Sequence, residues 1–283
     1  MNKKQLIIFV AIIGILGIFF ACTLSDDGEE TSSSTYKITY DGNGNIGGTV
    51  PSDNNTYEEG VTVPVLTNAG SLSRIPDAGT GEAFKFLGWN TQINGNGIDF
   101  TEGSAFTMGS ANVTLYAKWG AFDLRDTGPS GNLIFYDKGV YNSGWRYLEA
   151  APTDQGSSEW IYGVTPQNTE NGNTSTAIGS GQMNSEYIID QFAHERSAAE
   201  VCLNYVYSST YSDWFLPSLD ELTEMYNNLH DQLTPLGGFG TVRYWSSSEQ
   251  NAIWAWAVSF FNGTSVSNLS KNNSCYVRPI RAF

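Results

Sequence analysis

The chain has 283 residues, with 29 acidic and 14 basic side chains, 3 cysteines and 2 histidines. A formal charge of −15 argues against nucleic acid as a partner, because phosphate binding needs clustered Lys and Arg. The few histidines and cysteines leave little material for a zinc site, and we expect no metal and no cofactor. At roughly 150 residues per domain, the length predicts about two domains.

The first residues have the layout of a secretory signal peptide. A basic start at Lys3 and Lys4 precedes an apolar run from Leu6 to Phe20. This run is shorter than the about 20 residues that a membrane-spanning helix needs. We therefore expect residues 1–21 to be a signal peptide, with a retained N-terminal anchor helix as the alternative.

Cys22 follows the small residue Ala21 directly, an arrangement that resembles the lipobox of bacterial lipoproteins. The resemblance implies that Cys22 becomes the lipidated first residue of the mature protein. The stretch after it is acidic and rich in Ser and Thr, so residues 22–35 are predicted to form a flexible tether. The expected location is the bacterial cell envelope, on the outer surface, with the membrane contacted through the lipid.

Residues 36–119 alternate short β-type runs with Gly/Asn turns and have no helical periodicity. The predicted strand segments are Tyr36–Tyr40, Thr62–Leu66, Phe84–Trp89 and Asn112–Trp119. In the last of these, Val113, Leu115 and Ala117 share one face and polar or larger residues share the other, which is the pattern of a half-buried strand.

Four motifs in this region resemble the Listeria/Bacteroides repeat, the B-repeat of internalin-type surface proteins. They are Tyr40-Asp41-Gly42-Asn43-Gly44, Tyr57-Glu58-Glu59-Gly60, Phe86-Leu87-Gly88-Trp89-Asn90 and Val113-Thr114-Leu115-Tyr116-Ala117-Lys118-Trp119. The resemblance covers residues 36–119 and implies a small, β-grasp-like all-β module that serves as a spacer or adhesive element.

Residues 42–47 also spell the dinucleotide-binding pattern G-x-G-x-x-G after a strand. That pattern needs a following helix N-terminus for the pyrophosphate, and Gly48 to Pro51 would break such a helix. Asp41, Asn43 and Asn45 imitate the first ligands of a calcium loop, but later positions lack the Gly and Glu that it requires. We interpret the segment as a turn.

Residues 121–283 hold the helical patterns. One helix is expected from Tyr187 to Tyr205, and Ser218 with Glu221 forms a capping box that predicts a second helix. The tail from Tyr244 to Phe283 is β-type, with turns at Asn262-Gly263 and Asn272-Asn273. The fold class expected for this region is α+β.

Five motifs here resemble the DUF1566 family, which includes the C-terminal domain of the Legionella collagen-like adhesin. They are residues Gly131–Gly139, Gly144–Ala150, Asp213–Ser218, Trp245–Glu249 and Tyr276–Arg278. The resemblance implies that residues 121–283 form a C-type-lectin-like domain. For the Legionella member it implies binding of sulfated polysaccharide, which the 17 acidic and 8 basic side chains of this region disfavour.

Cys202 and Cys275 are the two cysteines left after lipidation of Cys22. An exported location favours a disulfide between them, and the pairing resembles the bridge from helix to last strand in lectin-like domains. Two free buried thiols are the alternative.

Several residues near the motifs are interpreted as structural. Trp214, Leu216, Pro217 and Trp245 are assigned to the core, and Arg278 and Arg281 to ion pairs. The polar run of Ser246, Ser247, Ser248 and Glu249 is expected to satisfy backbone groups, with a pocket lining as the alternative.

No catalytic residue is assigned. His194 and His230 are expected to be helix residues without a catalytic role, since no G-x-S-x-G or H-E-x-x-H motif accompanies them. The lectin-like fold also hosts formylglycine-generating oxidases, which use a pair of active-site cysteines. An enzyme on such a scaffold therefore remains an alternative, as does a purely structural envelope protein.

The stretch from Gln250 to Asn273 is the predicted recognition segment. Aromatic rings stack on the C–H faces of sugars, while amides and hydroxyls bond sugar hydroxyl groups. The candidate ligand-binding residues are Trp254, Trp256, Asn262, Thr264, Asn268, Asn272 and Asn273. The alternative is a solvated hairpin with both tryptophans packed inward. The expected function is that of a surface lipoprotein, without catalysis, that binds an extracellular glycan or protein.

Overall fold

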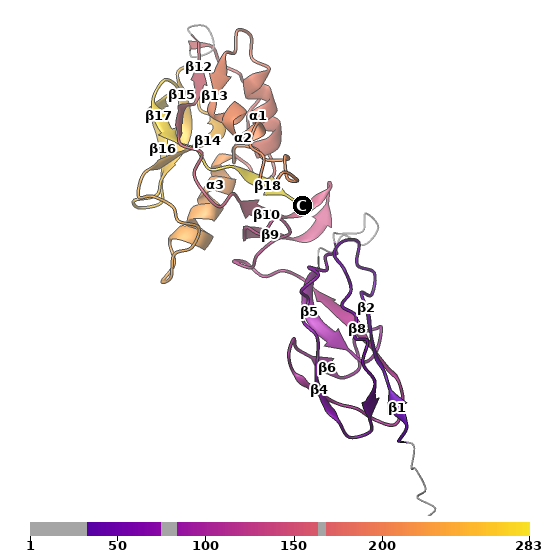
Figure 1. Cartoon of the computed structure of the whole chain (residues 1–283). Coiled ribbons are helices and arrows are strands. Elements are labelled where there is room, and N and C mark those ends of the chain that lie inside the picture. The colour runs from indigo at the N-terminus through magenta and orange to yellow at the C-terminus, as the bar shows by residue number, and fades with distance from the viewer. Residues whose placement is uncertain (1–32, 75–83, 164–167) are drawn as a thin grey trace, which may run out of the picture. The chain divides into compact units, whose positions relative to one another are not determined.

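The computed structural model describes residues 33–74, 84–163 and 168–283. The predicted signal peptide at 1–21, the lipidation site Cys22 and most of the predicted tether at 22–35 lie outside the described residues. Within them, the chain is predominantly β-sheet with a few short helices (Figure 1). No helix in this described part is long and apolar enough to cross a membrane.

The N-terminal β region, residues 35–120, contains strands but no helix among its described residues. Its strands are β1 (Thr35–Tyr36), β2 (Ile38–Asp41), β3 (Tyr57–Glu58), β4 (Thr62–Pro64), β5 (Lys85–Asn90), β6 (Asp99–Phe100), β7 (Ala105–Thr107) and β8 (Val113–Gly120). The predicted segments Thr62–Leu66, Phe84–Trp89 and Asn112–Trp119 each correspond to one strand, whereas Tyr36–Tyr40 is divided between β1 and β2, which belong to different sheets. Strands β3, β6 and β7 are two or three residues long, too short to show a period of two.

The main sheet of this region has the strand order β2-β8-β5-β6. Strands β2 and β8 are parallel, with Ile38 opposite Val113, whereas the β8–β5 and β5–β6 pairs are antiparallel. Leu115 and Ala117 of β8 are buried, as the alternating pattern predicts. Asn43 and Gly44 have positive φ angles of 46° and 80°, so residues 42–44 form a turn and not a phosphate-binding loop.

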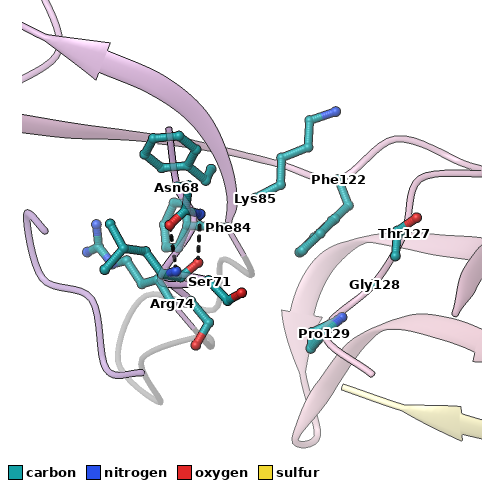
Figure 2. A pocket seen from close by; sticks show the side chains of 12 residues that line it. Asn68, Ser71, Arg74, Phe84, Lys85, Phe122, Thr127, Gly128 and Pro129 are labelled. Carbon is teal, nitrogen blue, oxygen red and sulfur yellow. Dashed lines mark hydrogen bonds between the residues drawn. The ribbon is translucent and has the colours of Figure 1, made fainter. Parts of the chain in front are cut away.

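The core of the N-terminal β region is built around Trp89, which is fully buried. Its ring meets the edge of Tyr40 at a centroid distance of 4.7 Å, and its indole N–H donates to the carbonyl of Leu66 at 2.9 Å. Asn68 closes the next loop with two hydrogen bonds to the backbone of Leu72, drawn as dashed lines in Figure 2. The Arg74 guanidinium lies 4.5 Å from the centre of the Phe84 ring. Local side-chain contacts therefore fix the described parts of the connection between β4 and β5.

The C-terminal region, residues 121–283, combines strands with short helices. Its elements are β9 (Leu133–Asn142), β10 (Trp145–Ala150), β11 (Ser157–Glu159), β12 (Ile161–Tyr162), α1 (Gly181–Ile189), β13 (Arg196–Ser197), α2 (Ala198–Leu203), α3 (Leu219–Met225), the π-helical turn η2 (Tyr226–His230), β14 (Arg243–Glu249), β15 (Trp254–Ser259), β16 (Thr264–Ser270), β17 (Ser274–Tyr276) and β18 (Ile280–Ala282). The strands form a five-stranded sheet, β11-β17-β14-β15-β16, a three-stranded sheet, β18-β10-β9, and the pair β12-β13.

The five-stranded sheet lies between two apolar clusters. Tyr244 and Val258 belong to a cluster that includes Leu222 of α3, whereas Trp245 and Ala257 belong to one that includes α1 and α2 residues. Successive residues of β14 and β15 thus pack on opposite faces, as the period of a strand requires. Helices cover both faces of this sheet.

The single helix predicted from Tyr187 to Tyr205 is wrong. Helix α1 ends at Ile189, and α2 begins at Ala198 after the short strand β13. Ser197 is extended, pairs with Ile161 of β12, and accepts a hydrogen bond from the backbone N–H of Glu200 as the cap of α2. A capping serine therefore starts a new helix where the apolar spacing alone indicated continuity.

The capping box at the start of α3 is confirmed. The Ser218 hydroxyl accepts from the Glu221 N–H, and the Glu221 carboxylate accepts from the Ser218 N–H at 2.7 Å. Burial raises the pKa of Glu221 to about 7, although backbone N–H groups, including those of Ser218 and Gly179, oppose the shift. This buried carboxylate holds the chain before α1 and the start of α3 together.

Candidate functional site

The predicted recognition segment, Gln250–Asn273, comprises the β14–β15 turn, β15, the β15–β16 turn, β16 and the turn that leads to β17 (Figure 1). Strand β16 is the last strand in the order of its sheet, so the segment includes a sheet edge. Its polar residues face solvent at several separate places along this hairpin.

Trp254 and Trp256 begin strand β15 and lie on one strand face, as predicted. Ala255 and Ala257 between and beyond them are buried in the cluster with α1 and α2. Trp256 packs partly buried against the cluster on α3, whereas Trp254 is exposed and sits opposite Ser270 of β16. Trp256 is therefore mainly a core residue, whereas Trp254 presents an exposed ring on which a ligand can stack.

Asn262 lies in the β15–β16 turn and Thr264 begins β16, and the Thr264 hydroxyl donates to the side-chain oxygen of Asn262 at 2.8 Å. The turn needs Gly263, whose φ is +73° and whose added Cβ would lie 2.4 Å from the Tyr226 ring. Five residues of β15 separate this turn from Trp254, which corresponds to about 17 Å. Asn262 and Thr264 are thus at the opposite end of the hairpin from the exposed tryptophan.

Asn268, Asn272 and Asn273 are all exposed. Asn268 is on β16, and the other two form the predicted turn between β16 and β17, with the Asn273 N–H donating to the Ser270 carbonyl at 2.9 Å. Their side-chain amides make no hydrogen bond within the described part of the chain.

An open groove of about 670 Å³ lies beside this turn. Its lining combines the two turn asparagines with residues from the start of β14, from β16 and from β17: Val242, Arg243, Leu269, Asn272, Asn273, Ser274, Cys275 and Tyr276. Tyr276 is 40% exposed, and Arg243 is exposed at the first position of β14. Polar side chains at the rim thus surround a floor that includes the buried Leu269 and Cys275.

The seven predicted residues therefore do not form one site. Of the seven, only Asn272 and Asn273 line the groove. The other five lie outside its lining: Trp254, Trp256, Asn262, Thr264 and Asn268. Sequence reasoning missed Arg243 and Tyr276. Tyr276 belongs to one of the motifs that carry the family resemblance, and Arg243 stands one residue before the predicted β-type tail, so both lie outside the segment Gln250–Asn273.

A buried ion pair holds the recognition segment in place. Lys271 contacts Glu249 at 2.5 Å, and its ammonium also donates to the Thr169 carbonyl at 3.1 Å. Glu249 accepts backbone N–H bonds from Asn171 and Gly172, both at 2.9 Å. Burial lowers the pKa of Lys271, and Glu249 opposes that shift. The pair ties the turn before β17 to the loop at residues 168–173.

The predicted disulfide is not formed in this structure, since Cys202 and Cys275 are both free and buried. Both thiols belong to the apolar cluster beside α2, where they pack as small hydrophobic side chains. Burial raises the pKa of Cys202, and it raises the pKa of Cys275 to about 12, with Arg243 opposing. Neither thiol is therefore activated as a nucleophile.

The structural interpretations of the remaining motif residues are confirmed. Trp214, Leu216, Pro217 and Trp245 are buried. The three serines of β14 are fully buried: Ser246 donates to the carbonyl of Trp256, Ser247 accepts from the Asn184 amide, and Ser248 donates to the carbonyl of Ser175. Arg278 pairs with Asp154 at 2.7 Å, and Arg281 with Glu149 at 2.6 Å.

The two histidines lie apart from the groove. His194 is in the connection after α1, not in a helix as predicted, and its ring contacts the Ser197 hydroxyl at 3.0 Å. His230 ends η2 and packs against the ring of Phe260. Among residues 33–74, 84–163 and 168–283, no group of three or more His, Cys, Asp or Glu side chains is placed to hold a metal ion.

Residues 36–118 match the family model of the Listeria-Bacteroides repeat domain. This match confirms the assignment of the N-terminal β region made from its four motifs. It covers less than a third of the chain, and it says nothing about the C-terminal region.

Two curated relatives from Evansella cellulosilytica match a similar length of chain. One, named "Putative membrane protein", is 34% identical over 95 residues, which are 33% of this chain and 13% of the relative. The other, named "Putative Gly-rich membrane protein", is 34% identical over 89 residues, or 31% of this chain and 9% of the relative. The chain thus spans only a small part of the relatives that it matches.

A fimbrial protein from Bacteroides ovatus is a neighbour among solved structures. It is 11% identical, with a TM-score of 0.39 over 88% of this chain and 69% of its own.

Proposed function

We propose that the protein is a cell-surface lipoprotein in which the N-terminal repeat carries a C-terminal binding domain that recognises an extracellular glycan. The C-terminal domain is, in this proposal, a C-type-lectin-like member of the DUF1566 family. A signal peptide at 1–21 and lipidation of Cys22 would place it on the outer surface of the cell envelope. The confirmed repeat and the names of the two membrane-protein relatives support a surface location.

One observation carries the binding part of the proposal. The turn between β16 and β17 presents Asn272 and Asn273 at the rim of an open groove. Their side-chain amides can donate to and accept from the hydroxyl groups of a sugar. An open groove also admits one part of a long extracellular polymer, which an enclosed cavity would not.

The protein acts without catalysis, cofactor, metal or nucleic acid, and an extracellular protein is the other class of partner. Burial of both thiols speaks against a formylglycine-generating-oxidase-like enzyme, which would need a reactive cysteine pair.

The test is a binding screen of residues 23–283 on arrays of glycans and of matrix proteins, with and without EDTA. We expect a glycan signal that survives EDTA and falls at least about threefold in Asn272→Ala. Asn96→Ala, which removes an exposed amide in the N-terminal β region, is the matched control and should bind as wild type. Silence on both arrays would refute the proposal, and a signal on proteins alone would replace the glycan by a protein partner.

A further inference from the structure

Arg243 differs from every other basic residue of the C-terminal region. Each of the other seven has a polar partner within the described residues. Arg125 donates to Thr234, Lys138 to Asn142, Arg146 to Asp137, Lys271 to Glu249, Arg278 to Asp154 and Arg281 to Asp213, and Arg196 lies 4.0 Å from Glu159. The guanidinium of Arg243 has no hydrogen bond or ion pair in the described part of the chain, although the region carries 17 acidic side chains.

The unpaired guanidinium lines the same groove as the candidate sugar-binding groups. Tyr276 lies on β17, directly after Cys275, and Asn272 and Asn273 precede that strand. Strand β17 runs parallel to β14, with Tyr276 opposite Tyr244, the residue that follows Arg243. Paired residues of adjacent strands face the same side of a sheet, so the Tyr276 ring lies with Tyr244, whereas Arg243 faces the other side, where the Cys275 thiol lies.

These groups have complementary chemistry. The planar guanidinium of arginine forms two parallel hydrogen bonds to the two oxygens of a carboxylate, a geometry that the ammonium of lysine does not provide. A sugar that carries a carboxylate also offers hydroxyl groups to the side-chain amides of Asn272 and Asn273. Resting on the proposed function, we infer that the groove binds a carboxylated sugar, with Arg243 as the residue that receives the carboxylate.

The charge of the region limits how many anionic groups the ligand can carry. Residues 121–283 hold nine more acidic than basic side chains, and the groove lining contains one cation and no acid. The negative charge of the region would repel a polymer that carries several sulfate groups. A ligand with one carboxylate per bound sugar needs only the guanidinium of Arg243 as its counter-charge.

The experiment uses residues 23–283 and two ligand pairs measured by calorimetry. The first pair is trigalacturonate and its carboxyl-reduced counterpart, and the second is 3′-sialyllactose and lactose. The pairs distinguish uronic acids from sialic acids as the source of the carboxylate. We expect the carboxylated member of one pair to bind about tenfold or more tightly than its neutral partner.

Arg243→Gln should remove this preference while leaving the neutral sugar unchanged, and Arg243→Lys should keep part of it. Arg196→Gln makes the same change of charge at an arginine outside the groove and should behave as wild type. Because Arg243 is exposed, its replacement should not unfold the domain, which circular dichroism checks.

Equal binding of carboxylated and neutral sugars, or an unchanged preference in Arg243→Gln, would overturn the inference and leave the proposed function standing. A chain that binds neither ligand pair but does bind another array glycan would also overturn the inference alone. A chain that binds no glycan or protein at all would overturn both.

Discussion

The N-terminal β region and the C-terminal region use charged side chains in opposite ways. In the first, the ion pair of Lys118 with Asp99 is at the surface, where the two side chains are 31% and 57% exposed. In the second, Glu149, Glu221, Lys271, Arg278 and Arg281 are all buried.

Long irregular segments of the C-terminal region need fixed partners for their backbone groups. Arg278 shows how the buried charges supply them, since its guanidinium donates to the carbonyls of Ala151 and Gly237, 86 residues apart in the chain. In the N-terminal β region, by contrast, Asn68 bonds the backbone of Leu72, four residues further on. The C-terminal region thus uses buried charge to join segments that are far apart in the chain.

The largest expected effect is on the repeat. Trp89→Ala should lower the free energy of unfolding of the N-terminal β region by about 3–5 kcal/mol, because it removes a fully buried ring and leaves a cavity. Scanning calorimetry of residues 23–283 should show two transitions, of which only one moves. Trp89→Phe, which keeps an aromatic ring but loses the hydrogen bond to Leu66, should cost less. Equal shifts of both transitions would mean that the two regions unfold as one unit.

The next effect tests the buried charges. Arg281→Met should lower the stability of the C-terminal region by about 3–5 kcal/mol, because it leaves Glu149 buried without its partner. Adding Glu149→Gln in the same chain should restore part of the loss. Urea unfolding measures both variants.

Lys118→Met is the matched control, since it breaks an exposed pair and should cost less than about 1 kcal/mol. Similar losses for Lys118→Met and Arg281→Met would contradict the comparison between the two regions.

A third effect depends on pH. Burial raises the folded-state pKa of Glu221 to about 7, above the ordinary value of 4.5, so folding favours the protonated form. The stabilisation is complete below pH 4.5 and is lost as the pH rises through 7, by roughly 3 kcal/mol in total. Relative to Glu221→Gln, the wild type should therefore weaken between pH 4.5 and 7 and stay constant above. A difference that does not change with pH would refute the shifted pKa.

Local sequence signals predicted much of the fold. The alternation in β8, the capping box at Ser218 and the Asn262-Gly263 turn each depend on a few adjacent residues, and each is confirmed. The helix break at Ser197 was missed because it depends on pairing between β13 and β12, far apart in the chain. For Arg278 and Arg281 the sequence predicts ion pairs but does not identify the acidic partners.

The candidate site was harder to predict for the same reason. Composition indicated the segment from Gln250 to Asn273, and Asn272 and Asn273 do line the groove. Arg243 and Tyr276 join them through the parallel register of β14 and β17, which no local pattern reveals. Polar composition could not distinguish residues at the two ends of the same hairpin, which the structure separates.

The parallel pairing of β2 with β8 has a mechanical consequence. The first strand of the main sheet and its last strand run side by side in one direction, so the chain enters the sheet at one end and leaves it at the other. A force applied between the N-terminal side and the C-terminal side of this region pulls the two strands in opposite senses along their length. The hydrogen bonds between the two strands are then loaded in shear together, and the strands do not separate by breaking one bond after another.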